Sequence, residues 1–192
     1  VGFVRRSPLL FALLLIVTMA FAACQTQAPP LEVVPEVDLE RYVGRWYEIS
    51  SFPQRFQRGC VATQANYSRL ADGRIRVENE CRDGSLDGDP RRVEGVARAL
   101  DSASQAKLEV QFFWPFWGDY WIIDLDPDYR VAAVGHPSRD YLWILSRTPS
   151  MDPAAYTSLL ERVAAKGFEI ERLVETLQPV DSAARSGLEE TP

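Results

Sequence analysis

The sequence is poor in the residues that most catalytic and metal sites use. It has one histidine, His136, and three cysteines, and it contains no run of basic residues. A single histidine leaves no room for a His-rich metal site, and it allows a Ser-His-Asp arrangement only if His136 itself takes part. The formal net charge of −6, without a basic stretch, argues against nucleic-acid binding. We therefore expect no metal, no cofactor and no nucleic-acid partner.

Aromatic residues, in contrast, are plentiful: five Trp, seven Tyr and nine Phe. With few cysteines and methionines, this composition favours an all-β domain with a wide apolar interior over a helical bundle. A chain of 192 residues fits one domain of ordinary size with extensions.

The N-terminal segment has the pattern of an export signal. Arg5 and Arg6 precede an apolar run from Leu9 to Ala23, which at about 1.5 Å per residue spans roughly 22 Å and is too short for a bilayer core of about 30 Å. A basic start, a short apolar run and small residues before the cut are typical of a secretory signal over residues 1–23. The cysteine that follows, Cys24, has two interpretations. It is either a lipidation site or a chance cysteine after an ordinary signal peptide.

Residues 21–24, Phe-Ala-Ala-Cys, resemble the bacterial lipobox, in which the cysteine becomes the lipidated first residue of the mature protein. This resemblance implies that Cys24 anchors the protein in a membrane, and Gln25 implies sorting to the outer membrane. Residues 24–35 are then expected to be a polar, Pro-rich tether. We expect the domain to cover residues 36–179 and the polar residues 180–192 to form a disordered tail.

Strand patterns recur every ten to fifteen residues, separated by turn residues. The eight predicted strands cover Tyr42–Ser51, Val61–Leu70, Arg74–Arg82, Arg92–Leu100, Lys107–Trp114, Tyr120–Leu125, Tyr129–Gly135 and Tyr141–Arg147, with a turn at Pro115–Asp119. Sequential antiparallel strands of this number are expected to close into an up-and-down β-barrel, whose interior holds one small ligand.

One helix is predicted after the last of these strands. Asp152 is a suitable N-cap, Pro153 occupies the first turn, and Gly167 marks the end. The apolar face of this helix is expected to pack on the barrel wall. Phe168–Leu177 is predicted to add a short final strand to the outside of the barrel.

Two cysteines, Cys60 and Cys81, lie on neighbouring predicted strands joined by a turn. In an oxidising compartment a disulfide is the expected state, and it stabilises the fold by roughly 3 kcal/mol in the chain-entropy model. A zinc or catalytic role would need further ligands nearby, and none are visible.

Alternation along the strands predicts which side chains point into the barrel. The inward set on the middle strands contains Val77, Val93, Val110 and Phe112, and the eighth strand directs Trp143 and Tyr141 to one side. If Trp46 points inward, Glu48 and Ser50 follow it. Large aromatics on one wall and small residues on another favour a cavity, and the alternative is a filled barrel with Trp143 as core.

The first and last strands carry a pair of residues suited to close the barrel. Gly44 frees the backbone just before Trp46, and the eighth strand ends at Arg147. An arginine lying flat on an indole contributes roughly 0.5–2 kcal/mol. We expect Gly44, Trp46 and Arg147 to form the closed end.

At this point the sequence resembles the lipocalin family, in particular bacterial lipoprotein lipocalins related to apolipoprotein D. The resemblance rests on GRWYEIS (44–50), ATQANYS (62–68), PFWG (115–118), the LDPDY segment (125–129) and YLWILSR (141–147), and it covers residues 36–179. It implies an eight-stranded barrel with a C-terminal helix that binds a fatty acid, lysophospholipid or phospholipid at the outer membrane, held by its lipid anchor on the periplasmic face.

The binding mouth is expected at the end opposite Trp46, with Trp117 near its rim and with Arg55 and Arg58 either meeting an anionic headgroup or standing as solvated loop charge. The expected ligand-contacting residues are Trp143, Trp117, Tyr141, Phe112, Val110, Val93, Val77 and Ser50. A non-enzymatic binding role is expected. The alternatives are a lipid-modifying enzyme that uses Glu48 as acid or base and a scaffold that binds only protein. The sequence leaves both a monomer and a homodimer as alternatives.

Overall fold

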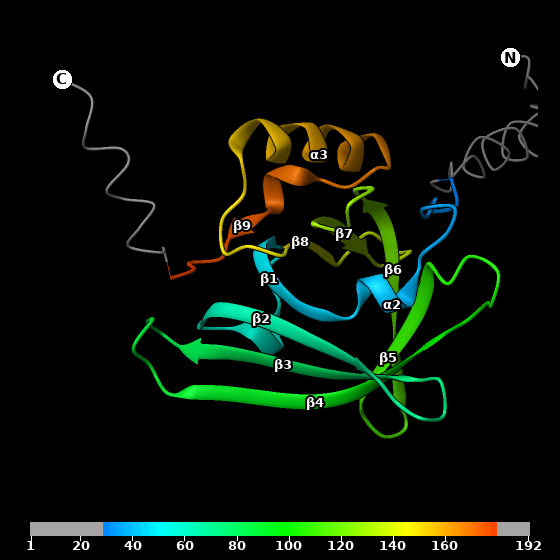
Figure 1. The fold of residues 1–192 in the computed structure, drawn as a ribbon. Coiled ribbons are helices and arrows are strands. Elements are labelled where there is room, and N and C mark those ends of the chain that lie inside the picture. Colours follow the sequence, from blue (N-terminus) through cyan, green and yellow to red (C-terminus); the bar gives the residue numbers. More distant parts are fainter. Residues whose placement is uncertain (1–28, 180–192) are drawn as a thin grey trace, which may run out of the picture. The chain divides into compact units, whose positions relative to one another are not determined.

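The computed structural model describes residues 29–179. The predicted signal peptide (1–23), the lipidation site Cys24 and the tail (180–192) lie outside the described residues. Eight antiparallel strands follow one another and close into a barrel, because β1 pairs with both β8 and β2 (Figure 1). The strands are β1 (Gly44–Ser51), β2 (Cys60–Arg69), β3 (Ile75–Asp83), β4 (Pro90–Ala99), β5 (Lys107–Phe113), β6 (Phe116–Leu125), β7 (Val131–Gly135) and β8 (Leu142–Ser146). The predicted fold class is confirmed.

The predicted strand ends differ from the observed ones most clearly around β6. This strand begins at Phe116, so most of the predicted turn Pro115–Asp119 is strand and the connection to β5 is only two residues long. The predicted final strand is also too long. The segment forms a 3-10 turn, η3 (Ile170–Arg172), and a two-residue strand, β9 (Val174–Glu175), that pairs with β1.

A short helix that the sequence analysis did not predict, α2 (Leu39–Tyr42), precedes β1. Its N-cap Asp38 accepts hydrogen bonds from the amides of Glu40 and Arg41, which satisfies donors that the first turn of a helix leaves free. Leu39 and Tyr42 are buried with Trp46 in the interior of the barrel. The helix therefore plugs one end of the barrel.

The last part of the predicted tether packs onto the domain. Leu31 is buried, and the Val34 amide donates to the carbonyl of Ile122 in β6 at 3.0 Å. Apolar residues in this stretch bury surface against the barrel, so residues 31–35 do not behave as a free linker.

The helix α3 (Pro153–Ala165) lies on the outside of the barrel. Asp152 caps it as predicted, accepting from the Ala155 amide at 2.9 Å. Leu159 and Val163 are buried against Ile123 and Ile144 of the strands beneath. The predicted packing of the helix on the barrel wall is confirmed (Figure 1). Among the described residues, no helix is both long and apolar enough to span a membrane.

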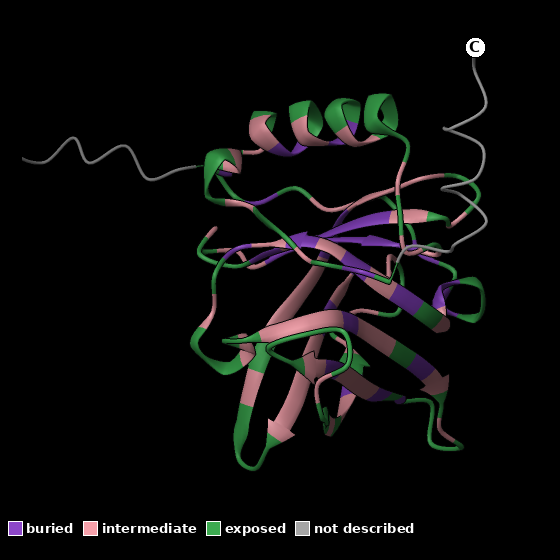
Figure 2. Cartoon of the chain, turned by 90° about the vertical axis from the view of Figure 1, so that its left-hand side faces the viewer, coloured by how far each residue is buried: buried purple, intermediate pink, exposed green. Residues whose placement is uncertain are grey.

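Burial is uneven around the barrel. The strands under α3, such as β7 and β8, are almost entirely buried, whereas β2 and β4 consist mainly of half-buried and exposed residues (Figure 2). A strand whose inner face were packed solid would show buried residues at every second position. On the inner face, Thr63 and Tyr67 of β2 and Ala97 of β4 are buried. Looser packing is therefore confined to the part of β4 around Val93 and Gly95.

Candidate functional site

The closed end of the barrel is built around Arg147. Its guanidinium lies 3.9 Å from the centre of the Trp46 ring, and it donates to backbone carbonyls of Arg41, Tyr42, Arg45 and Tyr129 at 2.8–3.1 Å. Trp46 is fully buried, and its indole N–H donates to the carbonyl of Tyr42 at 2.8 Å. The predicted contact between these two residues is confirmed, and it closes this end of the barrel.

Gly44 makes this contact possible. Its φ is +97°, a conformation that side chains rarely adopt, and a Cβ at this position would lie 3.3 Å from the nearer guanidinium nitrogen of Arg147. Both the positive φ of Gly44 and its closeness to Arg147 therefore agree with its predicted role in the closed end.

Three tyrosines from different elements meet inside the barrel above the closed end. The hydroxyl of Tyr120 lies 2.8 Å from that of Tyr42 and 3.0 Å from that of Tyr67. Burial raises the pKa of all three phenols, that of Tyr67 to about 12. The three residues form a neutral hydrogen-bonded floor. This floor could not be predicted from the sequence, because nothing in the spacing of tyrosines on separate elements shows that their hydroxyls meet.

Most of the predicted lining residues face the interior. Val77 is buried, and Val110, Phe112 and Trp143 are half-buried against the inner core. The ring of Phe112 lies over Gly95, where a Cβ would be only 2.8 Å from the ring. The absence of a side chain at Gly95 on β4 therefore makes room for the Phe112 ring on β5.

Val93 and Tyr141 extend the inner wall toward the open end. Val93 is half-buried and lies opposite Asn79 in the β3–β4 register. Tyr141 stacks on Trp143 with ring centres 6.2 Å apart and keeps 39% of its surface exposed. Both residues thus keep part of their surface exposed.

The prediction that Ser50 points into the barrel is wrong. A β-bulge inserts Ile49 between Glu48 and Ser50, whose partners Leu145 and Ile144 are adjacent on β8. The bulge reverses the alternation after Glu48. The Ser50 hydroxyl shares a 2.8 Å hydrogen bond with Tyr156 of the outer helix α3 and cannot line the interior.

Trp117 lies near the rim as predicted, at the start of β6, but the prediction that it contacts a ligand in the interior is wrong. Because Tyr120 faces inward and side chains alternate, Trp117 faces outward from β6. The guanidinium of Arg98 lies 4.3 Å from the centre of its ring on the outer surface. The sequence predicts a turn over residues 115–119, and side chains alternate between two faces only within a strand.

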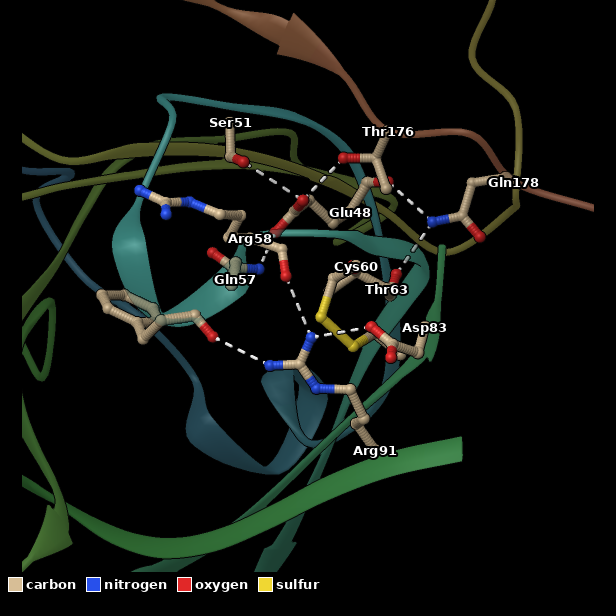
Figure 3. Close-up of a disulfide and its surroundings, with 12 residues drawn as sticks. Glu48, Ser51, Gln57, Arg58, Cys60, Thr63, Asp83, Arg91, Thr176 and Gln178 are labelled. Atoms are coloured by element: carbon tan, nitrogen blue, oxygen red, sulfur yellow. Dashed lines mark hydrogen bonds and ion pairs between the residues drawn. A yellow bond between two sulfur atoms is a disulfide. The ribbon is translucent and has the colours of Figure 1, made fainter. Parts of the chain in front are cut away.

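A buried carboxylate, Glu48, lies near the open end and is 5% exposed. One of its oxygens accepts from Ser51 and Thr176, at 3.1 and 2.6 Å, and the other accepts from Gln57 at 2.8 Å (Figure 3). The same Gln57 side chain accepts from the indole N–H of Trp143 at 3.3 Å. Glu48 thus links the inner wall, the loop after β1 and the C-terminal segment.

The C-terminal segment fills a gap in the barrel wall. β1 pairs with β2 only over residues 44–47, and beyond this point Gln178 bridges the two strands. Its side-chain amide donates to the carbonyls of Glu48 and Thr63, both at 2.8 Å (Figure 3). The Ala62 amide donates to the carbonyl of Leu177 at 2.7 Å. The wall is therefore closed by Leu177, the end of the predicted strand Phe168–Leu177, and by Gln178, which lies just beyond it.

The predicted disulfide between Cys60 and Cys81 is confirmed, and it joins β2 to β3 close to this gap (Figure 3). Beside it, Arg91 donates to the carbonyls of Phe56 and Arg58 and to the carboxylate of Asp83. These contacts hold the loop after β1 at the open end. Among residues 29–179, no group of three or more His, Cys, Asp or Glu side chains is arranged to hold a metal ion.

The open end also carries exposed aromatic side chains. Phe113, Trp114 and Phe116, at the connection of β5 and β6, expose 72–85% of their surface, and Phe56 in the loop after β1 exposes 63%. Both connections lie at the same end because they join odd-numbered strands to the following even-numbered ones. The nearby Arg55 and Arg58 are exposed as well. The rim thus combines aromatic and basic groups.

Comparison with known proteins agrees with this architecture. The sequence profile described as Lipocalin-like domain matches residues 37–178. The chain is 44% identical to temperature-induced lipocalin-1 of Arabidopsis thaliana over 162 residues, which are 80% of this chain and 86% of that protein. It is 42% identical to the outer membrane lipoprotein Blc of Citrobacter freundii over 167 residues, which are 85% of this chain and 94% of that protein.

A more distant relative is apolipoprotein D of Mus musculus, 36% identical over 162 residues that cover 79% of this chain and 81% of that protein. Among solved structures, insecticyanin from the tobacco hornworm Manduca sexta superposes with a TM-score of 0.64 at 18% identity, covering 82% of this chain and 88% of that chain. This last likeness concerns the fold alone.

Proposed function

The chain belongs to the lipocalin family, whose members bind small hydrophobic ligands, and we propose that it binds the acyl chain of a fatty acid, lysophospholipid or phospholipid inside its barrel. The observation that carries this proposal is the partly exposed apolar inner wall formed by Val93, Val110, Phe112 and Trp143. Burying a chain of about 16 carbons gains roughly 12 kcal/mol before ordering costs are subtracted.

The closed end supports one direction of entry. Trp46, Arg147 and the helix α2 occupy one end completely, so a ligand enters from the end that carries Tyr141 and the disulfide. An acyl chain would then run down along Val77 and Val110 toward the tyrosine floor, with its polar end nearer the mouth.

We place the protein at the bacterial outer membrane, anchored through Cys24 on the periplasmic face. Relatives 40–42% identical carry the name outer membrane lipoprotein, which supports the location. The exposed Phe113, Trp114 and Phe116 fit this setting, since aromatic side chains favour the interface between water and lipid. Mass spectrometry of the N-terminal peptide tests the anchor, and an unmodified Cys24 would rule it out.

An enzymatic role for Glu48 is the weaker candidate. Both of its oxygens are occupied by hydroxyl and amide donors, and its hydrogen-bond partners in the described part of the chain are Ser51, Gln57 and Thr176, none of which is a catalytic base. This arrangement is that of a structural carboxylate joining three segments.

Extraction and mass spectrometry of lipids from the purified protein tests the proposal. We expect a fatty acid or phospholipid in near-stoichiometric amount, and after delipidation we expect uptake of a fluorescent fatty-acid probe at micromolar concentration. The variant Trp143→Ala should weaken uptake while the circular dichroism spectrum is retained. Absence of both bound lipid and probe uptake would refute the proposal, and conversion of the added lipid would favour the enzyme.

A further inference from the structure

Two buried oxygens on the inner wall have no hydrogen-bond partner within the described residues: Oγ1 of Thr63 and Oδ1 of Asn79. Thr63 exposes only 8% of its surface. A buried polar atom without a partner is costly, and it calls for an explanation such as a missing ligand group.

Both side chains face the interior of the barrel. Asn79 shares its face of β3 with the buried residues Val77 and Cys81, and it lies opposite Ala65 of β2, which packs against the inner core. Alternation along β2 from Ala65 puts Thr63 on the same face. A bulge after Val61 leaves Thr63 near the level of Cys81, so the two polar residues are neighbours on the wall.

This polar spot lies about halfway along the barrel. Asn79 is four residues from either end of β3, which at about 3.3 Å per residue places it roughly 13 Å below the open end. Its neighbours on the same face, Val77, Val93 and Ala65, are apolar and offer no side-chain donor. A ligand group at this depth supplies the hydrogen-bond partner that these side chains lack.

The surroundings select a neutral group over an anion. The inward positions of β3 and β5 carry no basic residue, and Arg91 at the open end is already engaged by two carbonyls and by Asp83. The buried carboxylate of Glu48 on the neighbouring strand β1 would repel a second negative charge. An amide oxygen accepts a hydrogen bond, and a threonine hydroxyl can both donate and accept.

We propose that Thr63 and Asn79 form a subsite for a neutral hydroxyl group of the lipid ligand, such as a glycerol hydroxyl, which donates to Asn79 Oδ1 and accepts from the hydroxyl of Thr63. This inference rests on the proposed function and names the ligand class further: an acylated polyol in preference to a free fatty acid. The acyl chain then packs along the half-buried inner side chains Val93, Val110 and Phe112.

Displacement of a fluorescent lipid from the delipidated protein tests the subsite with three probes of equal chain length: 1-monopalmitoylglycerol, methyl palmitate and palmitic acid at pH 8. Methyl palmitate keeps the chain and the ester but lacks the hydroxyls. We expect monopalmitoylglycerol to bind at least tenfold more tightly than either of the other two.

The double variant Thr63→Val/Asn79→Leu should bring the ratio between monopalmitoylglycerol and methyl palmitate close to one, with the affinity for methyl palmitate changed less than twofold. The matched control is Asn66→Leu, because Asn66 faces outward from β2 and donates to Glu78. It should keep the wild-type ratio.

The outcomes separate the two proposals. If no probe displaces the fluorescent lipid, the proposed function fails. If the probes bind equally well to the wild type, or if palmitic acid binds more tightly than monopalmitoylglycerol, the subsite fails while the lipid-binding function stands. A preference for monopalmitoylglycerol over methyl palmitate that survives in the double variant also overturns the subsite. If the double variant does not fold, the ratio of the two affinities in the wild type tests the subsite by itself.

Discussion

The guanidinium of Arg147 lies 3.9 Å from the centre of the Trp46 ring and joins the last strand of the barrel to the first. Because the same side chain also donates to four backbone carbonyls, its removal loses the ring contact and leaves several acceptors unpaired. The two residues therefore act together as the clamp of the closed end.

Replacement of this arginine should be strongly destabilising. We expect Arg147→Ala to lower the free energy of unfolding by about 2–4 kcal/mol, and Arg147→Lys to lower it by less, since lysine keeps the charge but loses the planar fork of donors. Urea unfolding measures both. The exposed Arg76 on β3 provides the control, and equal effects of Arg76→Ala and Arg147→Ala would contradict the clamp.

Gly44 and Gly73 form a matched pair for a second prediction. Both have positive φ, +97° and +85°, but a Cβ at Gly44 meets Arg147, whereas one at Gly73 has nothing within 4 Å. Each Gly→Ala change strains the backbone by about 1 kcal/mol, and Gly44→Ala should cost more because the guanidinium must move. Thermal unfolding compares them, and a larger loss for Gly73→Ala would show that crowding at the clamp is unimportant.

The C-terminal segment should be needed to close the wall between β1 and β2. We expect Gln178→Ala to cost about 2 kcal/mol, because two carbonyls lose their donor at a buried site. Amide exchange at Ala62 should quicken, since its partner is the carbonyl of Leu177. The exposed neighbour serves as control: Leu177→Ala should change stability by less than about 0.5 kcal/mol. An unchanged rate of amide hydrogen exchange at Ala62 in the variant Gln178→Ala would contradict the role of the C-terminal segment in closing the wall between β1 and β2.

The tyrosine floor predicts a loss of stability at high pH. The pKa of Tyr67 is raised from 10.0 to about 12, so the folded state keeps a proton that the unfolded state releases. Stability is full below pH 10 and falls as the pH rises toward 12, by up to about 1.4 kcal/mol per pH unit for each such tyrosine. Urea unfolding at several pH values should show a shallower fall for Tyr67→Phe. Identical slopes for variant and wild type would exclude the effect.

The general architecture could be predicted from the sequence because it depends on alternation and turn residues. The eight strands, the disulfide and the contact between Trp46 and Arg147 all follow from patterns that are local or that involve few candidate partners. The N-cap at Asp152 is likewise a local signal.

The errors have physical causes that a periodic pattern does not reveal. A bulge at Ile49 inserts one residue and turns Ser50 toward α3, and no residue type in GRWYEIS marks that bulge. The side chain of Trp117 was predicted wrongly because Pro115 and Gly118 indicated a turn over residues 115–119, whereas the connection before β6 has only two residues. The helix α2 has only four residues, and its signal, an Asp before Leu-Glu, is weak on its own.

Substitutions at Val93 and Glu94 test most directly whether a lipid chain fills a space along the inner face of β4. Val93 points inward and is half-buried, whereas Glu94 is its exposed neighbour on the outer face. Titration of the delipidated protein with a fluorescent fatty acid should give one site per chain in the wild type and in Glu94→Trp. Binding should be lost in folded Val93→Trp, because the indole fills the space. Undiminished binding in Val93→Trp, or equal loss in both variants, would contradict the account.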